Sequence, residues 1–287
     1  MVAIHLSTIQ RYSTKDGPGI RSTVFLIGCN LRCAWCSNPE LMLPYNKLLH
    51  FSSLCRGCQS CVHAYPAAVY MEDGAIHMHP CAQHMAGELE EVCPFDALEQ
   101  VGMQVECQQL VKQLEKDFTY YEESGGGVTF SGGEPLVRKR DILLLCQRHP
   151  DCEFLAFTNG TLIDEEFADA LLRVKNFMPA ISVEGFEAET DDRRGAGTFA
   201  ATLRAMELLR ERRLPFGASC CYTSKNTEVI GSEAYFDFLV GQGAKFAWFF
   251  TYMPVGENAA PELIARPEQR AFMYRQVRRF RDEKPLF

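Results

Sequence analysis

Ser22-Thr-Val-Phe-Leu-Ile-Gly28 is a short run of β-forming residues that leads directly into Cys29-Asn-Leu-Arg-Cys33-Ala-Trp-Cys36. In parallel α/β folds, the side chains that carry chemistry follow the carboxyl ends of the strands. Three thiolates on one short loop can bind three corners of a cubane iron–sulfur cluster and leave the fourth iron without a protein ligand. An open metal position is typical of a catalytic site. A zinc loop completed by a distant residue is the alternative, although the x3-then-x2 spacing fits the usual pairs of Cys-x2-Cys poorly.

On either side of this loop the sequence alternates between strand-like and helix-like segments. The predicted strands are 22–28, 127–131, 153–158, 180–183, 216–222 and 245–251, and the predicted helices are 107–123, 139–148, 164–174, 198–212, 232–243 and 267–281. Every strand except the first is followed closely by a helix, which requires a parallel sheet with right-handed crossovers. Six such units predict an α/β fold with a partial (β/α)6 barrel rather than a closed barrel of eight units.

The composition is that of a globular protein. The chain has 287 residues, of which 47% are hydrophobic and 23% charged, and its net charge of −8 argues against a general nucleic-acid binder. No apolar run approaches the ~18–20 residues needed to cross a bilayer, and Met1-Val-Ala-Ile-His-Leu6 lacks the features of an export signal. We therefore expect a cytoplasmic protein with no nucleic-acid and no membrane partner. The chain has 13 cysteines, and in a cytoplasmic protein clustered cysteines are more often metal ligands than parts of disulfides.

The segment 45–104 is rich in metal-binding residue types and in short loops. It contains Cys55, Cys58, Cys61, Cys81 and Cys93 together with His50, His63, His77, His79 and His84. We interpret it as a small inserted metal module. The predicted organisation is then 1–44 for the first strand and cysteine loop, 45–104 for the insert, and 105–287 for the rest of the barrel.

A second motif lies at the end of the second predicted strand, in Val128-Thr-Phe-Ser-Gly132-Gly133-Glu134-Pro135. The two glycines let the backbone approach a ligand closely, and Glu134 can accept hydrogen bonds from an ammonium group. Together with Cys-x3-Cys-x2-Cys and the aromatic residue before Cys36, this motif resembles the radical S-adenosylmethionine (radical SAM) superfamily. The resemblance implies a [4Fe–4S] cluster on Cys29, Cys33 and Cys36, whose open iron chelates the amine and carboxylate of SAM.

Two later segments also resemble parts of that family which line the SAM site, namely Phe157-Thr-Asn-Gly-Thr161 and Ile181-Ser-Val-Glu-Gly185. The resemblance implies that Ser182 and Glu184 contact the ribose or the carboxylate. It also implies that Arg193 or Arg194 pairs with the SAM carboxylate, and Arg194 is our candidate. The alternative for both arginines is a solvated loop that caps a helix.

The N-terminal region narrows the resemblance to the glycyl-radical-enzyme activating enzymes. The matching stretches are Asp16-Gly17-Pro18-Gly19-Ile-Arg21, Cys36-Ser-Asn-Pro-Glu40 and Ser124-Gly-Gly-Gly-Val-Thr-Phe-Ser-Gly-Gly-Glu-Pro135. The resemblance implies a radical SAM oxidoreductase that abstracts a hydrogen atom from a backbone glycine of a partner glycyl-radical enzyme. Asp16, Gly17, Pro18 and Gly19 would form a surface with few side chains, on which the partner lies near the cluster. A plain turn before the first strand is the alternative.

Several of these activases carry a ferredoxin-like insert with two Cys-x2-Cys-x2-Cys-x3-Cys-Pro runs, in which the fourth cysteine of each run serves the other cluster. Here Tyr65-Pro66 stands where the first Cys-Pro is expected, whereas Cys93-Pro94 is present. One complete set results, namely Cys55, Cys58, Cys61 and Cys93, and it predicts one auxiliary [4Fe–4S] cluster. Of the second set only Cys81 remains, and His84 is a weak candidate for a second ligand beside it. A zinc site that uses His77, His79, Cys81 or His84 is the alternative.

From about residue 150 onward the motifs look more like those of radical SAM enzymes that modify peptides or small metabolites. The segments concerned are 158–160, 182–185, 191–199 and Tyr252-Met-Pro-Val-Gly256. A peptide- or metabolite-modifying radical SAM enzyme is therefore the alternative function. A non-enzymatic electron carrier and a cluster-free chain are the other rivals. For the activase we expect reduced flavodoxin or ferredoxin as the electron donor, and SAM as cofactor.

Overall fold

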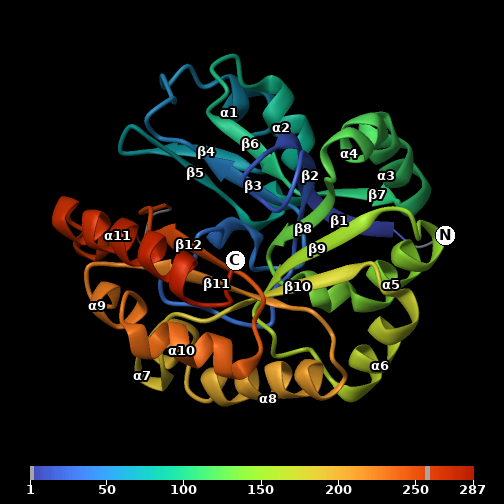
Figure 1. Ribbon diagram of the computed structural model, residues 1–287. Coiled ribbons are helices and arrows are strands. Elements are labelled where there is room, and N and C mark those ends of the chain that lie inside the picture. The colour runs from blue at the N-terminus through green and yellow to red at the C-terminus, as the bar shows by residue number, and fades with distance from the viewer. Residues whose placement is uncertain (1–2, 256–258) are drawn as a thin grey trace.

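The computed structural model describes residues 3–255 and 259–287 and contains a central sheet of eight strands (Figure 1). Six strands pair in parallel in chain order: β2 (Arg21–Leu26), β8 (Gly127–Gly132), β9 (Glu153–Thr158), β10 (Phe177–Ser182), β11 (Gly217–Tyr222) and β12 (Ala247–Thr251). Their carboxyl ends therefore lie at one edge of the sheet. The predicted α/β class with a partial barrel is confirmed. Met1 and Val2, and Gly256 of the segment Tyr252–Gly256, lie outside the described residues.

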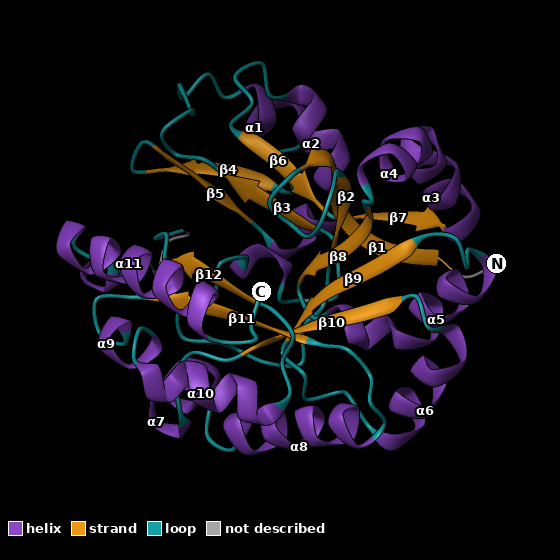
Figure 2. Ribbon diagram, in the orientation of Figure 1, coloured by secondary structure: helices purple, strands orange, loops and turns teal. Residues whose placement is uncertain are grey.

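Helices cover the outer side of this sheet, where Figure 2 shows α5, α6, α8 and α10 in a row. Their bounds are α3 (Cys107–Leu114), α4 (Phe118–Ser124), α5 (Lys139–Arg148), α6 (Glu165–Val174), α7 (Glu187–Arg194), α8 (Thr198–Glu211), α9 (Thr227–Ile230), α10 (Glu233–Gln242) and α11 (Pro267–Glu283). Short 3-10 helices span Pro39–Leu41, Pro80–Met85, Glu115–Asp117, Pro135–Arg138 and Pro261–Leu263. The main hydrophobic core lies between sheet and helices because alternate strand residues, such as Val128, Phe130 and Phe154, point to the helices.

Side-chain caps explain where two of the helices begin. The Asp164 carboxylate accepts a hydrogen bond of 2.8 Å from the backbone N–H of Phe167 at the start of α6. The Ser232 hydroxyl does the same for Tyr235 at the start of α10. Each cap satisfies a backbone donor that the first turn of a helix leaves without a partner.

Two antiparallel strands extend the sheet beyond β2. β1 (Ala3–Ser13) pairs with β2 on one side and with β7 (Met103–Glu106) on the other. Neither strand is among those predicted from the sequence. β12 and β7 stand at opposite ends of the strand order, so the barrel is open.

The segment between Asn46 and Gly102 folds beside the sheet, at the top of Figure 1. It contains β3 (Lys47–His50), α1 (Ser60–Ala64), β4 (Val69–Glu72), β5 (Ala75–Met78), α2 (Ala86–Val92) and β6 (Leu98–Val101). β3 pairs with β6 and β4 with β5, both antiparallel, and residues including Leu48, Val69 and Leu89 form a separate small core. A Cβ atom on Gly102 would lie 3.0 Å from the Asn46 side-chain oxygen, so the two ends of the segment touch.

Across the described ranges, the structure contains no helix with the length and apolar character that crossing a membrane requires.

Candidate SAM and iron–sulfur site

The cysteine loop begins two residues after β2 and is held by backbone hydrogen bonds from both sides. The N–H groups of Gly28 and Cys29 donate to the carbonyls of Leu41 and Met42, each at 2.9 Å. The N–H of Glu134 donates to the Gly28 carbonyl at 2.8 Å, which ties the loop to the end of β8. Gly28 has a φ of +99°, a conformation that favours glycine. The loop therefore has a fixed position at the carboxyl edge of the sheet.

The thiols of Cys29, Cys33 and Cys36 are all partly exposed. Two of the sulfurs accept backbone hydrogen bonds of 3.4 Å, Cys29 from Leu31 and Cys36 from Asn38. Burial, with smaller contributions from the nearby charges of Glu134, Cys33 and Cys36, raises the pKa of Cys29 to about 11, although the N–H of Leu31 opposes the rise. The three thiols are thus close enough to repel one another as thiolates. A cation that binds them must displace their protons and would remove this repulsion.

The spacing of these thiols bears on which metal group they fit. Within residues 3–255 and 259–287, no three His, Cys, Asp or Glu side chains converge on a position for a single metal ion. In a cubane cluster each thiolate binds a different iron, so the thiols must be near one another without meeting at one point. Three neighbouring, partly exposed thiols on one loop fit that requirement.

The end of β8 lies directly against the cysteine loop. A Cβ atom on Gly133 would be 2.4 Å from the Gly28 carbonyl oxygen, and Gly132 has a φ of +98°. The Glu134 carboxylate is 1% exposed and accepts hydrogen bonds from the N–H of Leu136 (2.9 Å), the Thr158 hydroxyl (2.6 Å) and the N–H of Asn159 (2.6 Å). Burial raises the pKa of Glu134, and these three donors oppose the rise.

Glu134 therefore has partners that the sequence analysis did not foresee. We expect its carboxylate to accept from the SAM ammonium, and in the structure it also connects the ends of β8 and β9. Oε1 already accepts from two donors and Oε2 from one. Since each carboxylate oxygen has about two acceptor sites, Oε2 retains one for a further donor.

The Glu184 carboxylate lies between two arginines of α7. Arg194 donates from Nε and Nη2 at 2.5 and 2.7 Å, and Arg193 donates from Nη1 at 2.6 Å. Burial opposes ionisation of Glu184, but the two guanidinium groups prevail and lower its pKa. Glu184 and Arg194 are thus each other's main partners, and contact of either side chain with SAM stays a prediction. The solvated-loop alternative is wrong, since both arginines are on a helix and their side chains are 7% and 9% exposed.

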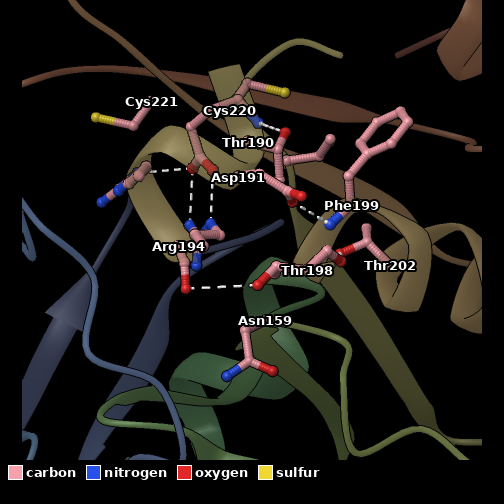
Figure 3. A network of polar contacts seen from close by, with 12 residues as sticks. Asn159, Thr190, Asp191, Arg194, Thr198, Phe199, Thr202, Cys220 and Cys221 are labelled. Atoms are coloured by element: carbon pink, nitrogen blue, oxygen red, sulfur yellow. Dashed lines mark hydrogen bonds and ion pairs between the residues drawn. The ribbon is translucent and has the colours of Figure 1, made fainter. Parts of the chain in front are cut away.

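Hydrogen bonds around Arg194 fix α7 to its neighbours (Figure 3). The Asp191 carboxylate accepts from the N–H of Phe199 at 2.8 Å, and the Thr198 hydroxyl donates to the Arg194 carbonyl at 3.4 Å. The Thr190 hydroxyl accepts from the N–H of Glu184 at 3.1 Å. The turn between α7 and α8 is therefore connected directly to the end of β10. Ser182, at that end, lies opposite Ser219 of β11.

Arg193 connects α7 to the cysteine loop. Its guanidinium carbon lies 4.1 Å from the ring centroid of Trp35, and its carbonyl accepts from the N–H of Ala34 at 2.8 Å. The charges of Arg193 and Arg194 also oppose the rise that burial causes in the pKa of Cys36. The sequence analysis named Arg193 only as an alternative to Arg194. Its stacking on Trp35 could not be anticipated because 158 residues separate the two in the chain.

Comparisons with known proteins agree with this geometry. The family model described as the Radical SAM superfamily matches residues 93–224. The isethionate sulfite-lyase activating enzyme of Oleidesulfovibrio alaskensis is 32% identical over 218 residues, which cover 73% of this chain and 69% of that protein. The chain belongs to the glycyl-radical-enzyme activating enzymes of the radical SAM superfamily. This membership implies a [4Fe–4S] cluster and SAM.

Other similarities cover less of the proteins concerned. The choline trimethylamine-lyase activating enzyme of the same organism is 40% identical over 148 residues, which are 49% of this chain and 48% of that protein. The chain thus spans about half the length of the first of its curated relatives. The solved structure of anSMEcpe with bound AdoMet has a TM-score of 0.53 at 18% identity, covering 88% of this chain and 55% of that one. This last likeness concerns the fold alone.

The activase-like stretch Asp16–Gly19 packs against Gly125-Gly126-Gly127. A Cβ atom on Gly126 would be 1.9 Å from the Ile20 carbonyl oxygen, and the N–H of Ile20 donates to the Ser124 hydroxyl at 2.8 Å. Arg21, 2% exposed, donates to the Pro18 and Val128 carbonyls from within this contact. The two activase-like motifs therefore form one packed unit.

This unit lies at the amino end of β2, whereas Cys29 follows the carboxyl end. Asp16 reaches further along the sheet, because its carboxylate accepts from the Thr23 hydroxyl at 2.8 Å and its carbonyl accepts from the Thr129 hydroxyl at 2.7 Å. A position of Asp16, Gly17, Pro18 and Gly19 near a bound cluster stays a prediction. Whether they contact a partner stays a prediction.

Four other cysteines of the activase-family chain line one pocket of the segment 47–101, namely Cys55, Cys58, Cys61 and Cys93. Two sulfurs are near donors: the N–H of Ala97 is 3.3 Å from Cys93 Sγ, and the Ser60 hydroxyl is 3.4 Å from Cys58 Sγ. That hydroxyl lowers the pKa of Cys58. Gly57 and Gln59 both have positive φ, so the loop curls around the pocket.

The remaining predicted ligands lie elsewhere in this segment. Cys81 is exposed, and its thiol donates to the Ala67 carbonyl at 3.3 Å. His77, His79 and His84 are exposed as well. Among the described residues these side chains do not form a group of three that could bind zinc.

Proposed function

We propose that this protein is a radical SAM oxidoreductase that installs a glycyl radical in a partner glycyl-radical enzyme. The observation that carries the proposal is the cysteine loop, whose three neighbouring thiols are held against the Gly132-Gly133-Glu134 turn by the bond from Glu134 N–H to the Gly28 carbonyl. Membership in the activase family supports the same conclusion.

Cys29, Cys33 and Cys36 would hold the [4Fe–4S] cluster, with SAM on the iron that lacks a protein ligand. When bound, the cluster supplies the electron that cleaves SAM into methionine and a 5′-deoxyadenosyl radical, which takes a hydrogen atom from the partner's glycine. The residues of the chain position the reactants and exclude water. Gly132 and Gly133 let the end of β8 lie directly against β2 and the cysteine loop, and the free acceptor site of Glu134 Oε2 would accept from the SAM ammonium.

Arg193 is a positioning residue in this proposal. It stacks on Trp35 within the cysteine loop and is fixed in turn by Glu184. Glu184 and Arg194 hold α7 and the end of β10, and with it Ser182, beside the ligand. Direct contact of Ser182 with the ribose is part of the proposal.

We also propose that residues 45–104 form a ferredoxin-like module with one auxiliary [4Fe–4S] cluster on Cys55, Cys58, Cys61 and Cys93. Their common pocket supports this assignment. Reduced flavodoxin or ferredoxin would be the electron donor, acting in the cytoplasm under anaerobic conditions.

Reconstituted protein is expected to contain about eight irons per chain, because one site of three thiols and one of four can each hold a four-iron cluster. Iron and acid-labile sulfide analysis measures this number. The variant Cys61→Ala should retain about four, and Cys81→Ala about eight, since Cys81 belongs to neither set. A wild-type value near twelve would mean that other ligands complete a second auxiliary cluster.

Glu134→Gln is expected to weaken both SAM binding and the fold. An amide cannot accept at both of its positions, so one of the N–H groups of Leu136 and Asn159 loses its acceptor, at a cost of about 1–3 kcal/mol. Loss of a charge-assisted bond to the SAM ammonium should reduce affinity roughly tenfold. Equilibrium binding of SAM and urea unfolding measure the two effects.

Thr158→Val separates these two roles of Glu134. It removes a hydrogen-bond donor and leaves the charge of the carboxylate intact, so stability should fall while SAM affinity is retained. If SAM affinity stays at the wild-type value in Glu134→Gln, the residue connects the two strands and does not bind the cofactor.

The proposed function is tested by anaerobic EPR of the reduced protein with SAM and a candidate glycyl-radical enzyme. A doublet from a glycyl radical on the partner, with 5′-deoxyadenosine as product, is the expected result. 5′-Deoxyadenosine without that doublet would favour the modification of another peptide or of a small metabolite.

A further inference from the structure

His50 shares the pocket of the four cysteines. It is the last residue of β3, where it pairs with Leu98 of β6, and both residues line the pocket together with Cys55, Cys58, Cys61 and Cys93. The N–H of the next residue, Phe51, donates to the Ala97 carbonyl at 2.8 Å. His50 is therefore placed by a strand pair rather than by a free loop.

The imidazole Nε2 of His50 is buried, and among the described residues it has no hydrogen-bond partner. Buried polar atoms in native proteins nearly always have one, so a buried nitrogen without a partner requires an explanation. Two of the pocket's sulfurs already have hydrogen-bond partners: Cys93 Sγ accepts from the N–H of Ala97, and Cys58 Sγ bonds with the Ser60 hydroxyl. A group bound to the four thiols would add further sulfur acceptors in the same pocket.

We propose that His50 Nε2–H donates a hydrogen bond to a sulfur of the auxiliary cluster and thereby raises its reduction potential. The inference rests on the auxiliary cluster of the proposed function. Reduction adds negative charge that is shared by the sulfurs, so a donor stabilises the reduced form more than the oxidised one. Such a donor favours electron entry into this cluster.

The test uses the full chain with Cys29, Cys33 and Cys36 replaced by alanine, so that only the auxiliary cluster contributes to the spectra. In an EPR-monitored redox titration, His50→Leu is expected to lower the reduced-to-oxidised ratio at a fixed potential about tenfold, a shift of 59 mV for one electron. In ENDOR, the parent chain should show one exchangeable-proton coupling in addition to that of the Ala97 N–H, and this additional coupling should be absent in His50→Leu. His50→Gln, which keeps an N–H donor, should restore part of the potential.

His63→Leu is the matched control, because His63 is an exposed histidine on α1 that does not line the pocket. Its potential should equal that of the parent chain. A His50→Leu chain with full iron content and an unchanged potential and proton coupling would overturn the role of His50. If His50→Leu fails to assemble the cluster, the role of His50 is overturned equally by a parent chain, labelled with 15N-histidine, that shows no histidine nitrogen coupled to the cluster. If the parent chain contains far fewer than about four irons, the assignment of the auxiliary cluster itself is overturned.

Discussion

Replacing Cys33 by alanine is expected to abolish the formation of 5′-deoxyadenosine and to leave the fold intact. Cys33 lies on a loop outside the hydrophobic cores, so its loss leaves no buried cavity. With two thiols left, two irons of the cluster would lack a protein ligand instead of one. The cluster should therefore be lost, and with it about four irons per chain. Product analysis by chromatography, iron analysis and thermal unfolding measure the three quantities.

Cys152→Ala is the matched control for that variant. Its thiol is partly exposed, like that of Cys33, but it precedes β9 at the amino edge of the sheet. Cleavage of SAM should continue in this variant. If Cys33→Ala still formed 5′-deoxyadenosine, the cluster would have to be assigned to other ligands.

Glu184→Ala is expected to cause the largest loss of stability, about 3–5 kcal/mol in the free energy of unfolding. The substitution leaves the guanidinium groups of Arg193 and Arg194 buried without their common carboxylate. For a chain of this size, that loss corresponds to a fall in Tm of about 6–20 °C. Glu187→Ala removes a carboxylate from the exposed first turn of α7 and should change Tm little. Equal Tm values for the two variants would show that the buried ion pairs contribute no net stability.

The same carboxylate predicts a pH dependence. Because the folded-state pKa of Glu184 is lowered, its contribution to stability is present above the unfolded-state pKa, about 4.3, and is lost as the pH falls through the folded-state value. The difference in stability between wild type and Glu184→Ala should therefore shrink below about pH 4. Denaturant unfolding at a series of pH values measures it.

The parallel strands and their helices could be predicted because each has its own periodic pattern. The predicted bounds of β9 and α5 agree with the structure, and both elements present regular apolar residues to the core. β1 could not be predicted in the same way, since only a few of its residues are buried and its pairing depends on distant β2 and β7. α7 is almost entirely polar, and tertiary ion pairs to Glu184 hold it in place.

The thiol ligands of the candidate site could also be predicted, because a metal group imposes spacing on neighbouring residues. The partners of Glu134 and Glu184 could not, because they come from strands and helices that the sequence does not place. Glu134 follows β8 and accepts from Thr158 at the end of the adjacent strand β9. Glu184 follows β10 and accepts from arginines at the end of the next helix, α7.

Because Asn46 and Gly102 are in contact, the segment between them can unfold without unfolding of the central sheet. The segment has its own core, and its ends are pinned to each other by β3 and β6. Opening it breaks that pairing but none of the hydrogen bonds among the six parallel strands, so local unfolding can proceed below the free energy of global unfolding. Native-state hydrogen exchange would then divide the chain into two cooperative units, with the four-cysteine pocket in the one that exchanges first.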